Sequence, residues 1–204
     1  MHTQQPNRQG LESWTTAMQQ ICGRFETALA SNHSLFIGEV STFSRAGLPL
    51  ANLRTNAGNI RRLGDNPTLD DDQHCFLVSQ RSGYCQITQN GQVIQLAPGD
   101  MLLMDSTGSI EISPFGLIEH ASLSLSRNEV CKQLGSASKT FGKISSSKAC
   151  GRMLHVLMDQ LCREGLEGQD SIGEGEALQS AFVSLLGSAF EVNDAPGDGG
   201  VSLQ

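Results

Sequence analysis

The chain has 204 residues, of which 38% are hydrophobic and 17% charged, a composition typical of a globular domain rather than of a disordered chain. Its 14 Lys and Arg residues are outnumbered by 21 Asp and Glu residues, which gives a net charge of −7. No segment gathers enough basic residues to follow a phosphate backbone. We therefore do not expect this chain alone to bind DNA or RNA.

The apolar runs are too short for a membrane helix. Met101–Met104, for example, is followed at once by Asp105, whereas a membrane-spanning helix needs about 20 residues. The polar stretch Met1–Arg8 lacks the apolar core of a secretion signal. We expect a cytoplasmic protein with no membrane contact.

The cysteines form no C-x-x-C pair and mostly lie within apolar patterns, so we expect reduced, buried thiols. They are Cys22, Cys75, Cys85, Cys131, Cys150 and Cys162.

The first predicted element is a helix over Leu11–Ser31, whose apolar residues are spaced three and four apart. From residue 35 to residue 125 the pattern changes to about eight short strand-like runs separated by turn residues. These runs are Leu35–Val40, Leu50–Ile60, His74–Gln80, Tyr84–Gln89, Val93–Leu96, Met101–Asp105, Ser109–Ile112 and Leu117–Leu125.

Two turns and one loop are specified within this region. Asn90-Gly91 is a pair that accepts positive φ, so it predicts a two-residue hairpin. Ala97–Asp100 contains Pro-Gly-Asp and predicts a sharp turn. The stretch Gly64–Gln73 is dense in turn formers and charge, which predicts an exposed loop.

Helical periodicity returns after Ser126. It predicts helices over Arg127–Leu134, Ser147–Cys162 and Gly175–Phe190, the last two as an antiparallel pair. We expect their apolar stripes to join the helices to the rest of the domain. The two stripes are Met153, Leu157 and Leu161, and Leu178, Phe182 and Leu185.

The end of the chain resembles a linker, because Asn193–Gly200 is rich in small and turn-forming residues. We therefore expect a domain over residues 1–192, with the barrel at about 35–125 and helices at about 127–190. Residues 193–204 would lead to a further domain.

A run of short antiparallel strands with a Pro-Gly-Asp turn predicts an α+β fold built on a small barrel or jelly roll that holds one small molecule. A metal site in such a barrel needs two histidines separated by one residue on a strand, with a carboxylate and a third histidine, and no two of the five histidines have this spacing. We therefore expect no metal and no cofactor. The alternative is a metal-dependent cupin enzyme, a dioxygenase or isomerase, that uses His74 and His120 with Glu111 or Glu119.

Other catalytic signatures are missing from the sequence. It contains no G-x-S-x-G elbow, no Cys-His constellation and no phosphate-binding glycine loop. We therefore expect a binding protein rather than an enzyme.

The segment Gly83–Asp105 carries a more specific signal. A strand ending in Gln89 is followed by a tight turn, then by Pro98-Gly99-Asp100 and an apolar strand closed by Asp105. This order resembles the sensory half of AraC/XylS-type transcriptional activators, and over residues 12–190 the chain is similar to that family. Trp14, Ile21–Phe25 and Asn59–Arg62 are similar to its FeaR-like branch, which activates phenethylamine and tyramine catabolism.

The resemblance implies a cupin-like double-stranded β-helix (jelly-roll) barrel with an N-terminal helix and a C-terminal helical pair. It implies a small-molecule effector, such as an aromatic amine or aldehyde, and homodimerisation through the C-terminal helices. In this family DNA is contacted by two helix-turn-helix units that would follow the linker and are absent here, and the acidic charge fits that division.

We expect the effector to be bound by residues from the helix, from several strands and from strand ends. The candidate ligand-binding residues are Trp14, Phe36, Arg62, Phe76, Gln80, Met104 and Glu111. Phe36, Phe76 and Met104 are generic lining candidates, and Phe115 is a fourth.

Several of these candidates have a structural alternative. Trp14 would stack on an aromatic ligand or anchor its helix in the core. Gln80 would bind a polar group of the ligand or a neighbouring strand. Arg62 would pair with an acidic ligand group or bridge to Asp105 or Glu111, and Glu111 would face the cavity or water.

Overall fold

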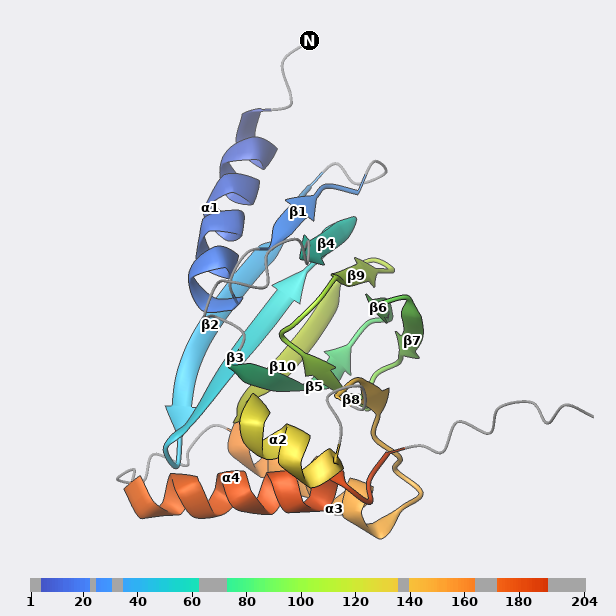
Figure 1. The fold of residues 1–204 in the computed structure, drawn as a ribbon. Helices are drawn as coiled ribbons and strands as arrows, with labels where there is room; N and C mark the ends of the chain where they lie inside the picture. Colours follow the sequence, from blue (N-terminus) through green and yellow to red (C-terminus); the bar gives the residue numbers. More distant parts are fainter. Residues whose placement is uncertain are drawn as a thin grey trace, which may run out of the picture.

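The computed structural model describes residues 5–22, 25–30, 35–62, 73–135, 140–163 and 172–190. Figure 1 shows the elements in chain order. They are α1 (Gln5–Cys22), β1 (Glu26–Ala28), β2 (Gly38–Arg45), β3 (Leu48–Thr55), β4 (Asn59–Arg62), β5 (His74–Ser82), β6 (Cys85–Gln89), β7 (Gln92–Leu96), β8 (Met101–Asp105), β9 (Ile110–Pro114), β10 (Ile118–Ser126), α2 (Arg127–Leu134), β11 (Gly142–Lys143), α3 (Ala149–Cys162) and α4 (Ile172–Leu186).

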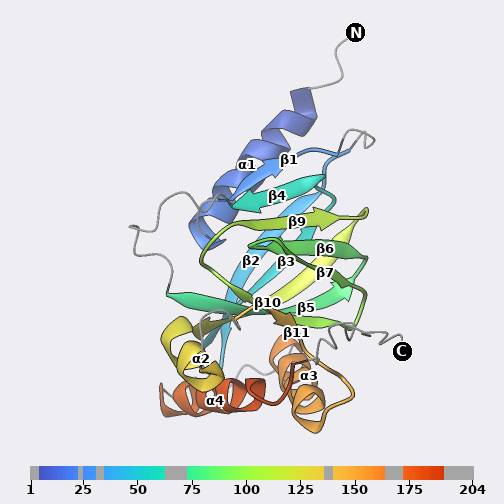
Figure 2. The same ribbon diagram turned by 45° about the vertical axis from the view of Figure 1, so that its right-hand side comes forward.

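The strands form two antiparallel sheets that face each other. One has the order β1-β4-β9-β6-β7 and the other β11-β8-β5-β10-β3-β2. α1 lies along β1 and β2, and the three later helices lie below the barrel in Figures 1 and 2. This arrangement confirms the expected α+β jelly-roll barrel with a helix before it and helices after it.

The six-stranded sheet is covered on both faces over part of its area. On β5, Phe76, Val78 and Gln80 point between the two sheets, while Cys75 and Leu77 point toward the helices. The core between the sheets and α1 includes Trp14, Met18, Phe25, Ile60, Ile87, Leu102, Ile110 and Ile118. The core between the sheet and α2, α3 and α4 includes Leu50, Leu103, Leu123, Val130, Leu154, Met158, Phe182 and Leu186.

The N-terminal helix begins and ends earlier than the sequence predicts, at Gln5 rather than Leu11 and at Cys22 rather than Ser31. α1 ends at Cys22, and the chain then forms β1, which pairs with β4. Phe25 and Leu29 keep the helical spacing in sequence, but Phe25 is buried in the core between the sheets. The packing of Phe25 in the barrel core therefore outweighs the helix propensity of this segment.

The strand boundaries differ at two places in the first part of the barrel. β2 and β3 form a long hairpin closed by Ala46 and Gly47, both with positive φ. The predicted strand Leu50–Ile60 is broken after Thr55, where the Asn56 side chain accepts from the Ile37 amide and donates to the Leu35 carbonyl. These hydrogen bonds stabilise the segment between β3 and β4, where the chain passes from the six-stranded sheet to the five-stranded sheet.

Both predicted turns are confirmed. Asn90 and Gly91 have φ of 50° and 82° and join β6 to β7. At the second turn, Oδ2 of Asp100 accepts from the Ala97 amide at 2.7 Å, and Gly99 has a φ of 89°. Residues 64–72 of the predicted loop and the predicted linker 193–204 lie outside the described residues.

The helices after the barrel lie close to their predicted positions, and α3 packs against α4. The buried stripe of α3 matches the prediction in part: Leu161 is buried and Leu157 packs against the core, while the other buried positions are Gly151, Leu154 and Met158. Met153 is 55% exposed. A shift of one residue along a helix turns a side chain by about 100°, so apolar content alone does not fix which face is buried.

No helix among the described residues is long and apolar enough to cross a membrane. The described cysteines form no disulfide bonds; Cys75 and Cys85 are buried, and Cys131, Cys150 and Cys162 are half-buried.

Candidate ligand-binding cleft

The interior of the barrel is largely filled by its own side chains. A cavity of about 50 Å³ lies there, lined by residues of β2, β3, β5, β8, β9 and β10 and by Met18 and Phe25, with His120 and Ser122 as polar groups. Ligand pockets usually measure about 300–1,000 Å³, and this cavity has room for a few water molecules only. The expected chamber for a metabolite is therefore not open between the sheets.

Two of the seven predicted ligand-binding residues, Phe76 and Met104, line this interior cavity. Trp14 lies beside it in the core: its Nε1 donates to Oγ1 of Thr27 at 3.1 Å, and its ring meets Phe36 edge-to-face at 6.2 Å. Trp14 is 3% exposed. Trp14 and Phe36 thus hold α1 against the barrel.

Gln80 stabilises the turn that leads from β5 in one sheet to β6 in the other. Its Nε2 donates to the carbonyl oxygens of Ser82 and Gly83 at 2.8 and 2.9 Å, and its Oε1 accepts from the Cys85 thiol. Cys85 also contacts Nε2 of His120 at 3.5 Å. Burial lowers the pKa of His120 to about 4 and raises that of Cys85 to about 12, so both are neutral at pH 7.

Arg62 and Glu111 lie away from the interior cavity. Arg62 donates to the carbonyl oxygen of Ser106. Glu111 lies between the inward-facing Ile110 and Ile112, so its side chain points outward, where Arg61 pairs with it at 3.2 Å. The alternation of β9 therefore excludes Glu111 from the barrel interior.

The alternative metal site is not assembled. His74 and His120 lie at opposite ends of β5 and β10, because His74 is opposite Ser126 and His120 is opposite Gln80. Glu111 faces outward on the other sheet, and Glu119 pairs with Arg54 on the outer face. In the part of the chain that the structure describes, no three His, Cys, Asp or Glu side chains are placed to hold a metal ion.

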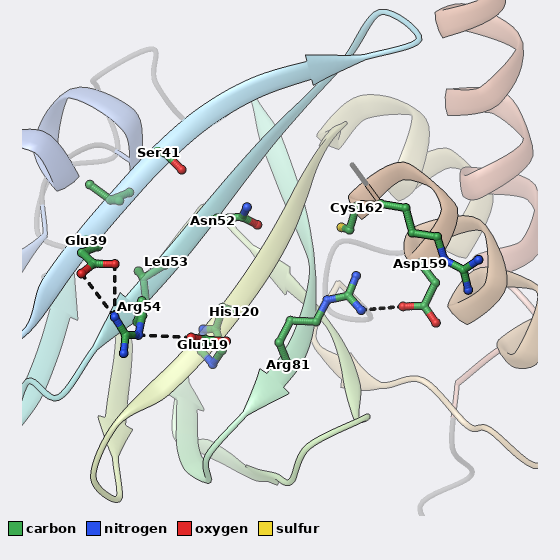
Figure 3. A pocket seen from close by; sticks show the side chains of 12 residues that line it. Glu39, Ser41, Asn52, Leu53, Arg54, Arg81, Glu119, His120, Asp159 and Cys162 are labelled. Carbon is green, nitrogen blue, oxygen red and sulfur yellow. Dashed lines mark hydrogen bonds and ion pairs between the residues drawn. The ribbon is translucent and has the colours of Figure 1, made fainter. Parts of the chain in front are cut away.

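A much larger cavity of about 740 Å³ lies on the outer face of the six-stranded sheet. Figure 3 shows it between the strands and the last turn of α3. Its lining residues are Glu39, Val40, Ser41, Asn52, Leu53, Arg54, Arg81, Glu119, His120, Asp159, Cys162 and Arg163. We call this space the outer cleft.

Charged side chains of four neighbouring strands lie in one row across the floor of the outer cleft. The register places Glu39 opposite Arg54, and Arg54 opposite Glu119. The Arg54 guanidinium pairs with both carboxylates, at 3.3 Å from Glu39 and 3.1 Å from Glu119 (Figure 3). Arg81 extends the row onto β5.

The far wall of the cleft joins the sheet to α3. Nη1 of Arg81 lies 2.6 Å from Oδ1 of Asp159, and the Arg81 side chain also contacts Cys162. Burial acts to lower the pKa of Arg81, but the contacts with Cys162 and Asp159 outweigh it and raise the pKa. This wall therefore stays charged and links the two layers of the domain.

The outer cleft was missed in the sequence because its residues are far apart in the chain and only the strand register brings them together. A signal was nevertheless present in the strands themselves. The face of β3 and β10 that is apolar at Leu50 and Leu123 becomes polar at Arg54 and Glu119. Such a change along one face indicates that helices cover only part of a sheet.

No protein-family profile matches the chain. Among solved structures, the AraC-like transcriptional activator CuxR is similar with a TM-score of 0.72 and 13% sequence identity, over 91% of this chain and 67% of that chain. The EutQ protein of Clostridium difficile has a TM-score of 0.36 and 8% identity over 49% of this chain and 76% of its own. A cupin domain of an XRE-family regulator from Enterobacter cloacae has a TM-score of 0.35 and 11% identity, over 43% of this chain and 94% of its own.

At 13% identity the similarity to CuxR shows a shared fold. It extends beyond the barrel, since 91% of this chain is matched. The combination of a jelly-roll barrel with flanking helices is therefore one that an AraC-like activator also has.

Proposed function

We propose that the chain is the ligand-sensing domain of an AraC-like transcriptional regulator, and that its effector binds in the outer cleft. The observation that carries the proposal is the position of this cleft, whose floor is the barrel sheet and whose far wall is α3. Its volume of about 740 Å³ suits a small molecule. The similarity in fold to CuxR supports the regulatory role.

A ligand in this position has a physical route to regulation. It contacts both layers, so it favours the arrangements of barrel and α3 in which both sets of contacts are made. α3 packs against α4, which is the last described helix before the end of the chain. A change in α3 would thus reach the segment that we propose as a linker, residues 193–204, and a helix-turn-helix domain beyond it.

The proposal retains the remaining expectations from the sequence. Residues 1–192 form the effector-binding and dimerisation domain, which is cytoplasmic, has no cofactor and is not an enzyme. Exposed Met153 and Val156 on α3, at 55% and 59%, support dimerisation through the C-terminal helices. An activator of the FeaR-like branch would take an aromatic amine or aldehyde, and the cleft carboxylates Glu39 and Glu119 suit an ammonium group.

A thermal-shift screen of amines, aldehydes and carboxylic acids tests this proposal on the 204-residue chain. A ligand at 100 times its dissociation constant adds about 2.7 kcal/mol of stability. Asn52→Trp places an indole on the floor of the cleft and should abolish the shift, whereas Gln95→Trp, on the exposed edge strand β7, should not. A shift that survives Asn52→Trp would place the effector elsewhere.

A further inference from the structure

The charges in the outer cleft point to the chemistry of the ligand. We propose that the cleft takes a dipolar molecule, an ω-amino acid with its ammonium at Glu39 and Glu119 and its carboxylate at Arg81 and Arg163. This inference rests on the proposed function, because it assumes that the outer cleft is the effector site. It replaces the aromatic amine or aldehyde of the FeaR-like branch with a ligand that carries both charges.

The negative end of the cleft lies on β2, β3 and β10. There two carboxylates, Glu39 and Glu119, share the single guanidinium of Arg54, which leaves one net negative charge. Each carboxylate has about four acceptor positions. Arg54 fills only part of them, so an ammonium group finds free acceptors on both.

The positive end lies at the junction of β5 and α3. Arg81 and Arg163 contribute two guanidinium groups against the single carboxylate of Asp159, which leaves one net positive charge. The side chain of Arg163 makes no ion pair or hydrogen bond with another described residue. A guanidinium is a planar donor that binds a carboxylate in a bidentate manner.

The floor between the two ends offers neutral polar groups. Ser41 and Asn52 are exposed, lie opposite each other on β2 and β3, and point into the cleft in Figure 3. Neighbouring strands are about 4.8 Å apart. The step from the middle of the negative end, on β3, to Arg81 on β5 is two strands, roughly 10 Å.

This separation selects among dipolar molecules. Glu119 on β10 is one strand from Arg81 and Glu39 on β2 is three strands away. An α-amino acid could bridge Glu119 and Arg81 but is too short to hold its ammonium between Glu39 and Glu119 at the same time. A chain of four to eight carbons, counted with the carbons that carry the ammonium and the carboxylate, spans the gap. The proposed ligand class is therefore the ω-amino acids rather than the α-amino acids.

Isothermal titration calorimetry with three matched probes tests the inference on the 204-residue chain. 6-Aminohexanoate carries both charges, hexylamine only the ammonium and hexanoate only the carboxylate. We expect 6-aminohexanoate to bind at least tenfold more tightly than either of the others. In a second series, 6-aminohexanoate should also bind more tightly than glycine.

Two variants assign the ends. Glu39→Gln should weaken 6-aminohexanoate and hexylamine but leave hexanoate unchanged, and Arg163→Gln should weaken 6-aminohexanoate and hexanoate but leave hexylamine unchanged. Both side chains are exposed, so the fold should tolerate the changes. Glu174→Gln, on α4 and outside the cleft lining, is the matched control.

The outcomes separate this inference from the proposed function. Equal affinities for the three probes, or no binding of 6-aminohexanoate, would overturn the ligand class. If Asn52→Trp abolishes whatever binding a wider screen detects, the cleft still serves as the effector site. Binding of 6-aminohexanoate that survives Asn52→Trp would overturn both assignments.

Discussion

The Asp105 carboxylate accepts from Nε of Arg127 at 2.9 Å and so ties the last residue of β8 to the first residue of α2. Oγ1 of Thr140 donates to the same carboxylate at 2.6 Å, and the Thr107 amide donates at 2.9 Å. Burial acts to raise the pKa of Asp105, but these hydrogen bonds outweigh it and hold the pKa below its ordinary value. Asp105 is thus a junction between barrel and helices.

The first prediction concerns Asp105→Asn, which should lower the free energy of unfolding by about 3 kcal/mol because it breaks a largely buried ion pair. Urea denaturation at pH 7 measures the change. Glu111→Gln removes an exposed carboxylate paired with Arg61 and should cost less than about 0.5 kcal/mol. Equal effects of the two variants would show that the Asp105 junction adds nothing to stability.

The second prediction concerns the pH dependence caused by His120. Burial lowers its pKa in the folded protein to about 4, whereas the unfolded chain takes up a proton near pH 6.5. Protonation therefore favours the unfolded state as the pH falls. Between pH 6.5 and 4 the folded state should lose about 3 kcal/mol through this group, and above pH 6.5 it should lose nothing.

Urea denaturation at several pH values, comparing wild type with His120→Leu, measures this loss. The variant should lack the His120 part of the slope. His155, whose pKa is also lowered by burial, contributes in the same pH range to both proteins, so only the difference is diagnostic. His74→Gln, at an exposed position on the neighbouring strand β5, should keep the wild-type slope. Parallel profiles for wild type and His120→Leu would contradict the prediction.

Much of the barrel could be predicted because short stretches of local sequence determine its strands and turns. Asn90-Gly91 and Pro98-Gly99-Asp100 restrict φ over a few residues, and the apolar runs before, between and after these turns match β6, β7 and β8. The hairpin at Ala46-Gly47 was missed because alanine rarely adopts positive φ. There the pairing of two eight-residue strands outweighs the local preference.

The candidate site was harder to predict than the fold. The alternation of side chains along β5 places Phe76 and Gln80 on one face but does not say whether that face points inward. No sequence pattern gives the cavity volume that remains after the side chains pack. Met18 and Phe25 reach the edge of the interior cavity and help to fill it. The outer cleft depends on the register between strands far apart in sequence, such as β3 and β10, which only the folded chain defines.

The third prediction concerns Trp14 and its hydrogen bond to Thr27. Trp14→Phe keeps most of the apolar contact with the core but removes the donor to Oγ1, so it should cost about 1 kcal/mol. Thr27→Val removes the acceptor and should cost a similar amount. Because both changes break one bond, the double variant should be less destabilised than the sum of the two, as a double-mutant cycle by urea denaturation will show. Full additivity would mean that the bond has no energetic weight.

The fourth prediction concerns Gly151, where α3 approaches the chain before it. A Cβ at this position would lie 1.9 Å from the carbonyl oxygen of Ser145. The amide of Ser145 donates to the Ala189 carbonyl at 2.7 Å. A displaced Ser145 would therefore also disturb Ala189, which lies just after α4. Gly151 therefore sets how closely α3 lies on the segment that joins it to β11.

Gly151→Ala should lower the free energy of unfolding by about 2 kcal/mol, because overpacking outweighs the gain in helix propensity of about 1 kcal/mol. Gly173→Ala is the matched control on α4, where nothing lies within 4 Å of the added Cβ. It should stabilise the protein by about 0.5 kcal/mol. Thermal and urea denaturation of both variants measure the contrast. A stabilising Gly151→Ala would mean that α3 can move away from Ser145 without loss, and the far wall of the outer cleft would then be free to shift as well.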